Sequence, residues 1–215
     1  MPRPLEGATR LVLIRHGQGE VNLGGLILAS TCTGLTDLGA AQAAALAERL
    51  ERSGELGETS VLYASGLRRA QETAGFVGRA LGLEVAEHLA ALNELEPGEA
   101  DGMSWDEYAR RFPGRDLAAE PDVPFAPGGE SWNGFLARVA AEVDRLLALH
   151  RGGTVVAVTH AGVIEAAMVH LSGLVPTRKR LRPEHTSLTS WVDVGEHLAL
   201  ERFGDAGHLG GLAHG

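Results

Sequence analysis

The chain has 215 residues, of which 44% are hydrophobic and 22% charged, and a formal net charge of −9 at pH 7. An acidic protein of this kind has no general affinity for nucleic acid or anionic membranes, so neither is expected as a partner. The single cysteine, Cys32, excludes a disulfide within the chain. No stretch approaches the ~18 consecutive apolar residues of a membrane span. Residues 1–10 contain no apolar signal-peptide core, so we expect a cytoplasmic protein.

The first half of the chain alternates predicted strands and helices. The apolar residues 11–14 predict a buried strand, and the glycine-rich residues 19–34 predict an irregular loop. Thr36 is suited to cap a helix that ends before Gly54. The elements expected next are a strand at 60–64, a helix at about 67–81 and a weakly patterned strand at 84–91.

The second half begins with an irregular region. Residues 92–130 are rich in proline, glycine and acidic residues, with one short helix that Ser104 caps and Pro113 stops. This region is too short and too polar for a core of its own, so we expect an insertion over the sheet edge. The elements expected after it are a helix from Ser131 to about His150, a strand at 154–158, a helix ending near Gly173, strands at 186–194 and 197–203, and a flexible tail at 207–215.

Strands that alternate with helices predict an α/β fold. We expect residues 1–215 to form one domain, a three-layer sandwich with a mostly parallel central sheet. Ligands of such sheets bind at the carboxyl ends of the strands. Side chains that directly follow the strands are therefore the first candidates for a functional site.

Basic side chains follow three of the predicted strands. Arg15 and His16 end the first strand, His160 ends a later one, and Arg68 and Arg69 open the helix after the second strand. If these strands are neighbours, the side chains converge on one crevice that suits a small multivalent anion. Phosphate fits best, because arginine binds its oxygens in pairs and helix N-termini add N–H donors. Each residue also has a plainer interpretation, as a loop or core histidine or a solvated arginine, and spacing alone leaves the choice open.

The opening loop permits a different interpretation. Residues 17–22 nearly match the glycine-rich fingerprint of dinucleotide-binding proteins. However, Asn22 replaces the third glycine, and Glu20 would repel the pyrophosphate. The next strand ends in Tyr63-Ala64-Ser65, which offers no acid to hold a ribose. We therefore rank this interpretation low.

Several short motifs occur in order along nearly the whole chain. They are Arg15-His16-Gly17 followed by Glu20 and Asn22, then Leu35–Ala43, Ser65–Ala74, Leu92-Asn93-Glu94 with Gly98 and Gly102, Pro127–Ser131, Val158–Gly162 and Asp205–Leu209. Together they resemble the signature of the histidine phosphatase superfamily, the phosphoglycerate mutase-like enzymes. The first three-residue motif alone is weak, but the ordered set is specific.

This resemblance implies a phosphoglycerate mutase-like fold, with the insertion over the active site, and a role for each matching residue. His16 would be the nucleophile that takes the phosphoryl group, and Glu94 the general acid and base. The nucleophilic imidazole must be neutral, whereas His160 serves better protonated, as an added donor to the phosphate. Arg69 matches the family's arginine, so Arg68 is expected on the surface. The residues that would hold the phosphate are Arg15, Asn22, Arg69, His160 and Ala161.

The chain departs from the family pattern in residues 23–34. Leu26, Leu28 and Cys32 stand where the family usually has arginine, glutamine and aspartate. We expect Leu26, Leu28 and Ala29 to contact the substrate and to form an apolar wall, which suits a less polar leaving group than phosphoglycerate. The alternative is that the leucines only pack into the core. Cys32 is expected to act as a small hydrophobe and not as a nucleophile.

The resemblance predicts a histidine acid-type phosphatase, a metal-independent phosphomonoesterase that hydrolyses a small phosphorylated metabolite through a phosphohistidine on His16. No cofactor or metal is expected, because arginine supplies the positive charge and no pair of histidines shows metal-ligand spacing on one helix face. Two alternatives stay open: a phosphoglycerate or phosphosugar mutase of the same fold, and a non-catalytic phospholigand-binding protein.

The insertion favours the phosphatase branch. Mutases of the family bind substrate with two arginines from a longer insertion, and Arg110 and Arg111 lie too close to Glu94 for that part. The basic run 178–182 is either a solvated loop or a substrate contact. A homo-oligomer is possible from the sequence, which contains no feature that decides it.

Overall fold

The computed structural model describes residues 7–117, 119–174, 181–193, 195 and 197–212. The strands are β1 Arg10–Arg15, β2 Thr59–Ser65, β3 Val85–Leu89, β4 Thr154–Thr159, β5 Leu188–Asp193 and β6 Leu198–Asp205. The α-helices are α1 Asp37–Ser53, α2 Arg68–Leu81, α3 Trp105–Arg111, α4 Trp132–Leu149 and α5 Ala161–Ser172. The 3₁₀ helices are η1 Glu20–Leu23, η2 Ala90–Leu92, η3 Gly98–Ala100 and η4 Gly207–Leu209.

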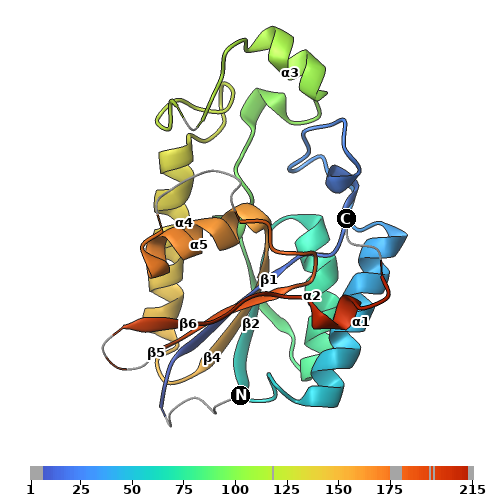
Figure 1. The fold of residues 1–215 in the computed structure, drawn as a ribbon, viewed down its shortest axis with the longest axis vertical. Helices are drawn as coiled ribbons and strands as arrows, with labels where there is room; N and C mark the ends of the chain where they lie inside the picture. Colours follow the sequence, from blue (N-terminus) through green and yellow to red (C-terminus); the bar gives the residue numbers. More distant parts are fainter. Residues whose placement is uncertain (1–6, 118, 175–180, 194, 196, 213–215) are drawn as a thin grey trace.

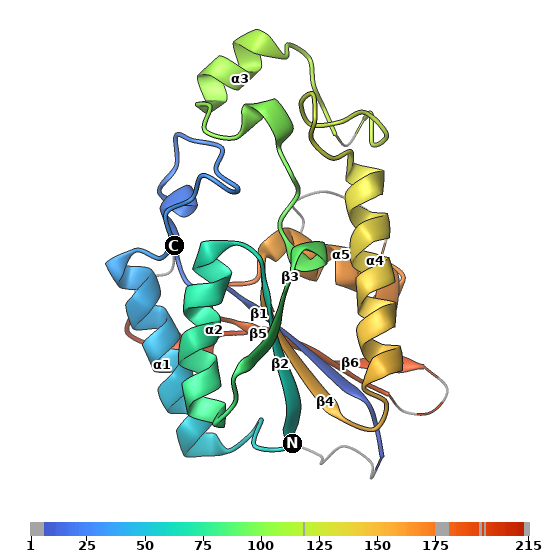
Figure 2. The same ribbon diagram turned by 180° about the vertical axis from the view of Figure 1, so that it is seen from behind.

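The six strands form one sheet in the order β3-β2-β4-β1-β5-β6. The first four in this order are parallel, and β5 and β6 pair antiparallel at the other edge. α1 and α2 cover one face of the sheet, and α4 and α5 cover the other (Figures 1 and 2). The expected three-layer α/β fold with a mostly parallel sheet is confirmed.

The side chains of β1 show how the two faces are built. Leu11 and Leu13 pack in the core under α4 and α5, whereas Val12 and Ile14 pack in the core under α1 and α2. Successive side chains of a strand point to opposite faces, so a strand covered on both sides must be apolar throughout. Burial of β1 on both faces explains why residues 11–14 are all apolar.

Three helix starts expected from the sequence are confirmed by their caps. The hydroxyl of Thr36 accepts a hydrogen bond from the backbone N–H of Gly39 at the start of α1, and Ser104 and Ser131 cap α3 and α4 in the same way. Each side-chain oxygen satisfies one of the N–H groups that a helix start leaves without a partner. Gly54 ends α1 with a φ of 61°, a left-handed conformation that favours glycine.

Residues 92–130 lie beyond the carboxyl ends of the parallel strands, beside the loop that follows β1 (Figures 1 and 2). The N–H of Ile27 donates to the carbonyl of Met103, and the N–H of Gly102 donates back to the carbonyl of Ile27. The buried rings of Tyr108 and Phe125 stack 4.4 Å apart and belong to the same core cluster as the side chains under α4 and α5.

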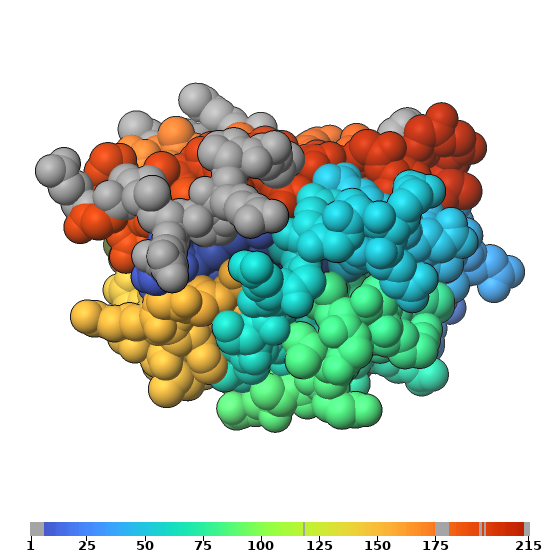
Figure 3. Space-filling model, turned by 90° about the horizontal axis from the view of Figure 1, so that it is seen from below, coloured from blue at the N-terminus to red at the C-terminus, as the bar shows by residue number. Residues whose placement is uncertain are grey.

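The opposite end of the molecule, where α1, α2 and α4 end, is shown in Figure 3.

Residues 207–212, the described part of the expected flexible tail, contain a short helix. Gly207–Leu209 forms η4, and Leu209 is completely buried. His208 Nε2 lies 2.8 Å from the hydroxyl of Thr186. Burial of Leu209 favours this ordered turn, whereas the conformational entropy of the neighbouring glycines opposes it. Residues 213–215 lie outside the described part of the chain, as do 178–180 of the basic run. No described helix is long and apolar enough to cross a membrane.

Candidate active site

The sheet order places β2, β4 and β1 side by side, so their carboxyl ends meet at one edge. His16 follows β1, His160 follows β4, and Arg69 lies in the first turn of α2 after β2. All three side chains are buried, at 3%, 0% and 2% exposure. The three strand-end side chains thus lie together, as the strand order predicts, but none of them is among the residues that line the cavity described below. Arg68 instead is exposed and pairs with Glu72 at 2.7 Å, as expected for a surface residue.

The hydrogen bonds of His16 determine its tautomer. Nδ1 lies 2.6 Å from the carbonyl oxygen of Gly17, and Nε2 lies 3.2 Å from the guanidinium Nε of Arg69. A carbonyl can only accept a hydrogen bond, so Nδ1 carries the proton. Nε2 then accepts from Arg69 through its lone pair, the electron pair that a nucleophilic histidine uses.

The electrostatic surroundings keep His16 neutral. Burial, with the nearby His160, Arg69 and Arg15, lowers the pKa of His16 well below 6.5. Burial disfavours the charged imidazolium, and neighbouring cations repel it. The expected neutral imidazole is therefore what this environment favours.

His160 lies beside His16, with the two ring centroids 5.0 Å apart. Its Nε2 lies 2.7 Å from the hydroxyl of Ser65, which donates its own proton to Asn93 Oδ1 at 2.9 Å. Nε2 of His160 is therefore the donor, and Nδ1 is buried with no hydrogen-bond partner among the described residues. Burial, followed by Arg69, lowers the pKa of His160 well below 6.5. The expectation that His160 is protonated when it holds phosphate stays a prediction.

Glu94 lies at the junction of two segments. Its carboxylate accepts hydrogen bonds from the backbone N–H groups of Leu95 and Gly162, each at 3.0 Å. Gly162 is in the first turn of α5, where the backbone N–H groups have no partner within the helix. A Cβ at position 162 would collide with this carboxylate.

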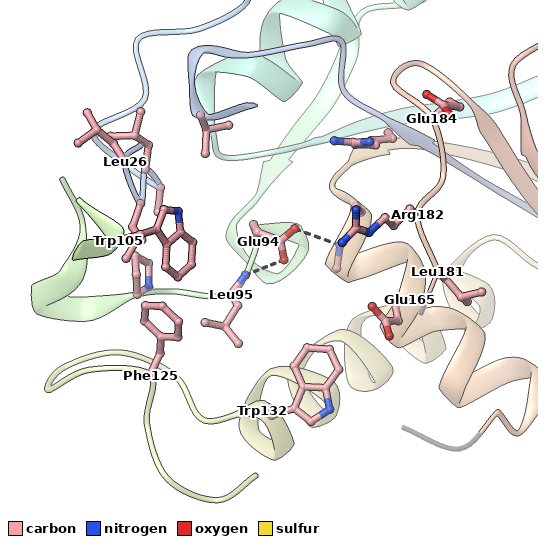
Figure 4. A pocket seen from close by; sticks show the side chains of 18 residues that line it. Leu26, Glu94, Leu95, Trp105, Phe125, Trp132, Glu165, Leu181, Arg182 and Glu184 are labelled. Carbon is pink, nitrogen blue, oxygen red and sulfur yellow. Dashed lines mark hydrogen bonds between the residues drawn. The ribbon is translucent and has the colours of Figure 1, made fainter. Parts of the chain in front are cut away.

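A cavity of about 620 Å³ opens beside these residues (Figure 4). Arg15, Glu94 and Ala161 line it, as do the predicted substrate-contact residues Leu26, Leu28 and Ala29. Leu26 is 44% exposed, so it is not packed into the core; the neighbouring Ile27 is the buried residue of this run. Cys32 is buried, as expected of a small hydrophobe.

Asn22 is not among the residues that line the cavity. Its Oδ1 accepts a hydrogen bond from the N–H of Gly19 at 2.9 Å and thereby holds the start of η1. Its contact with phosphate stays a prediction. Among the described residues, no group of three or more histidine, cysteine, aspartate or glutamate side chains is arranged to hold a metal ion.

His185 belongs to this site but was not expected from the sequence. It is buried, with its ring centroid 5.9 Å from that of His16. Burial and the charge of Arg15 lower the pKa of His185 to about 3, so the ring is neutral at pH 7. Both ring nitrogens are buried without a hydrogen-bond partner in the described part of the chain. The next residue, Thr186, has a φ of 56°, which is strained for a β-branched residue.

A family model for the "Histidine phosphatase superfamily (branch 1)" matches residues 11–206. The chain belongs to this superfamily. The dinucleotide-binding interpretation of residues 17–22 is therefore wrong, because this loop leads into a histidine phosphatase site.

Individual relatives differ in reaction. The chain is 29% identical over 203 residues to a metal-independent phosphoserine phosphatase of Arabidopsis thaliana, covering 89% of this chain and 84% of that protein. It is 36% identical over 172 residues to a 2,3-bisphosphoglycerate-dependent phosphoglycerate mutase of Methylobacterium sp. (strain 4-46), covering 76% of this chain and 81% of the mutase.

Two solved structures resemble the protein over nearly the whole chain. A mycobacterial glucosyl-3-phosphoglycerate phosphatase is 32% identical with a TM-score of 0.74, over 91% of this chain and 97% of its own. YhfR of Bacillus stearothermophilus is 26% identical with a TM-score of 0.79, over 94% and 99% of the two chains. The protein is thus a phosphatase or mutase of this superfamily.

Proposed function

We propose that the protein is a phosphomonoesterase that works through a phosphohistidine on His16. The observation that carries the proposal is the state of His16: a neutral, buried imidazole whose Nδ1 proton is held by the Gly17 carbonyl and whose Nε2 lone pair faces Arg69. This arrangement supports attack by Nε2 on phosphorus, and a general-base residue is not needed to activate it.

In the first step, Arg69 moves its hydrogen bond from Nε2 of His16 to the bound phosphate, and the freed Nε2 lone pair forms a bond to phosphorus as the ester P–O bond breaks. Arg15 and Arg69 stabilise the charge on the three equatorial oxygens, which a loose phosphoryl-transfer transition state demands. Glu94, in its protonated form, gives its proton to the departing alkoxide. Phosphate bound beside His160 would raise the pKa of that residue, so that Nδ1 becomes a further donor to the phosphate.

In the second step, water attacks the phosphohistidine. The Glu94 carboxylate takes a proton from this water as the P–N bond breaks. This step releases inorganic phosphate and regenerates free His16 and protonated Glu94 for the next cycle. The positive charge for both steps comes from the two guanidinium groups, so the mechanism requires no metal or cofactor.

The insertion supports hydrolysis over mutase activity. A mutase must protect its phosphohistidine from water and hold a carboxylate substrate. Arg110 and Arg111 of α3 do not line the cavity, and Arg111 pairs with Glu99 at 2.7 Å. These arginines are therefore not arranged to take a substrate carboxylate. A pure phospholigand-binding protein would have no use for the carboxylate held at Glu94.

We expect His16→Ala to lower the turnover of p-nitrophenyl phosphate by at least ~1,000-fold, because it removes the nucleophile. Rapid acid-free quenching with labelled substrate should trap an alkali-stable, acid-labile phosphoryl adduct in the native protein only. Exposed His88, on β3, provides the matched control, and His88→Ala should keep normal activity. Turnover without an adduct would favour direct attack by water, and isomerisation of a phosphoglycerate without phosphate release would identify a mutase.

A further inference from the structure

We propose that the preferred substrate carries a bulky, apolar alcohol group, and that residues of the insertion select it. The proposal rests on the phosphomonoesterase function above and names the substrate class of the same site. The cavity, at about 620 Å³, is in the size range of sites that enclose whole drug-sized ligands, ~300–1,000 Å³. Phosphate alone would fill only part of it.

One side of the cavity is an apolar wall. It includes Leu26, Trp105 and Phe125, and the other large apolar residues that line the cavity are Leu28, Leu95 and Trp132. Figure 4 shows Leu26, Trp105 and Phe125 together on one side of Glu94, the residue beside which the leaving oxygen would lie. Trp105 is 45% exposed and Leu26 is 44% exposed, so water contacts large apolar surfaces that a ligand could cover.

The apolar wall is already assembled in the structure. The backbone N–H of Trp105 donates to the carbonyl of Gly25, and Leu26 forms an isolated β-bridge with Ser104. The ring of Trp105 packs edge-on against Phe125, with the centroids 6.2 Å apart and the planes at 87°. A ligand therefore need not pay the full entropy of ordering this surface.

The opposite side of the cavity is charged. Among the described lining residues, the charged ones outside the phosphate position are Glu165, Arg182 and Glu184, which Figure 4 shows on the other side of Glu94 from Leu26, Trp105 and Phe125. A bulky apolar leaving group would cover the exposed surfaces of Leu26 and Trp105, which the small polar leaving groups of phosphoserine and 3-phosphoglycerate would leave in water. Apolar esters are therefore favoured over these two carboxylate substrates.

A homologous series of n-alkyl phosphates tests this proposal, because the intrinsic reactivity of the ester changes little with chain length. We expect kcat/KM to rise from ethyl to butyl to hexyl phosphate by up to ~4-fold per CH₂, the value of full apolar burial. Phosphoserine and 3-phosphoglycerate should fall at least ~10-fold below hexyl phosphate. A flat series, or a preference for either carboxylate substrate, would overturn the substrate class while leaving the phosphatase function intact. Absence of turnover with every ester would contradict the proposed function itself.

Variants connect the preference to the apolar wall. Leu26→Ser and Trp105→Ala should each reduce the ratio of kcat/KM for hexyl phosphate to kcat/KM for ethyl phosphate by ~5-fold or more. Leu23→Ser is the control, because Leu23 is in the same loop, is 67% exposed and does not line the cavity. An unchanged ratio in Leu26→Ser, or an equal loss in Leu23→Ser, would contradict the assignment to this wall.

Discussion

The carboxylate of Glu94 is oriented by backbone N–H groups of Leu95 and Gly162, which belong to segments far apart in the chain. Glycine at 162 lets the start of α5 approach this carboxylate closely, because there is no Cβ in the way. The orientation of the proposed general acid and base thus depends on the absence of a side chain from another element.

Gly162→Ala should lower kcat by ~10–100-fold with little change in KM, because its methyl group displaces the Glu94 carboxylate from the reacting oxygen. Steady-state kinetics with p-nitrophenyl phosphate measure both constants. Gly75→Ala in α2 is the control, since its Cβ would meet only the Arg79 side chain, at an ordinary contact distance of 3.8 Å, and alanine favours a helix by ~0.5–1 kcal/mol. Normal kcat in Gly162→Ala would mean that Glu94 needs no such positioning.

Single residues differ in how well the sequence predicts them. His16, Arg69 and His160 stand at strand ends within recognisable motifs, so their convergence follows from the topology of a parallel sheet. His185 has no such marker. It enters the site because the N–H of Thr186 donates to the carbonyl of Arg15 at 3.0 Å, a contact between residues distant in the chain.

At the scale of elements, the loop after β1 and the insertion are joined through Asp101. Its carboxylate accepts hydrogen bonds from the backbone N–H groups of Ala29, Ser30 and Thr31, and from the hydroxyls of the last two. Burial alone would raise the pKa of Asp101, but these bonds outweigh it and lower the pKa. The charged carboxylate therefore holds the Leu26–Ala29 side of the cavity against the insertion.

Asp101→Ala should release residues 29–31 and loosen the cavity, which raises KM by ~5–10-fold, while kcat falls less because Asp101 contacts none of the proposed catalytic groups. The free energy of unfolding should fall by ~1–3 kcal/mol, because N–H groups lose their acceptor. Urea denaturation and steady-state kinetics provide the two measurements. Asp106→Ala, an exposed position of the same insertion, should change neither by a comparable amount. An unaltered KM in Asp101→Ala would argue that the loop is held by other contacts.

The element boundaries themselves were largely predictable, because they depend on neighbouring residues. The Thr36 hydroxyl and the N–H that it caps are three residues apart, and Ser104 and Ser131 repeat this spacing. The tail was not predictable in this way. Leu209 is buried by contact with elements from the rest of the chain, which its glycine-rich neighbours do not reveal.

For the whole molecule, the buried histidines link stability to pH. Burial lowers the pKa of His16, His160 and His185 below 6.5, the last to about 3. The unfolded chain takes up these protons near pH 6.5, but the folded protein does so only at lower pH. The contribution of these histidines to the free energy of unfolding is therefore complete above about pH 7. It decreases progressively as the pH falls below 6.5.

We expect Tm to fall by at least ~5 °C between pH 7 and pH 5, since each such histidine costs up to ~2 kcal/mol at pH 5. Thermal denaturation in buffers of constant ionic strength measures this. His185→Asn should make the decline shallower, and the exposed His88→Asn should leave it unchanged. A Tm that stays level from pH 7 to 5 would show that these histidines titrate normally in the folded protein.

The sequence by itself determined the alternation of strands and helices, the helix caps and the motif residues of the proposed phosphate site, because each is encoded by residues close together or by a fixed position after a strand. Only the tertiary structure decided which side chains complete the site. Ser65 and Asn93 orient His160, His185 lies beside His16, and Trp105 faces the cavity. These contacts join residues from separate segments. They form only when packing of the whole sheet and its insertion brings those segments together, and no local pattern records which surfaces will meet.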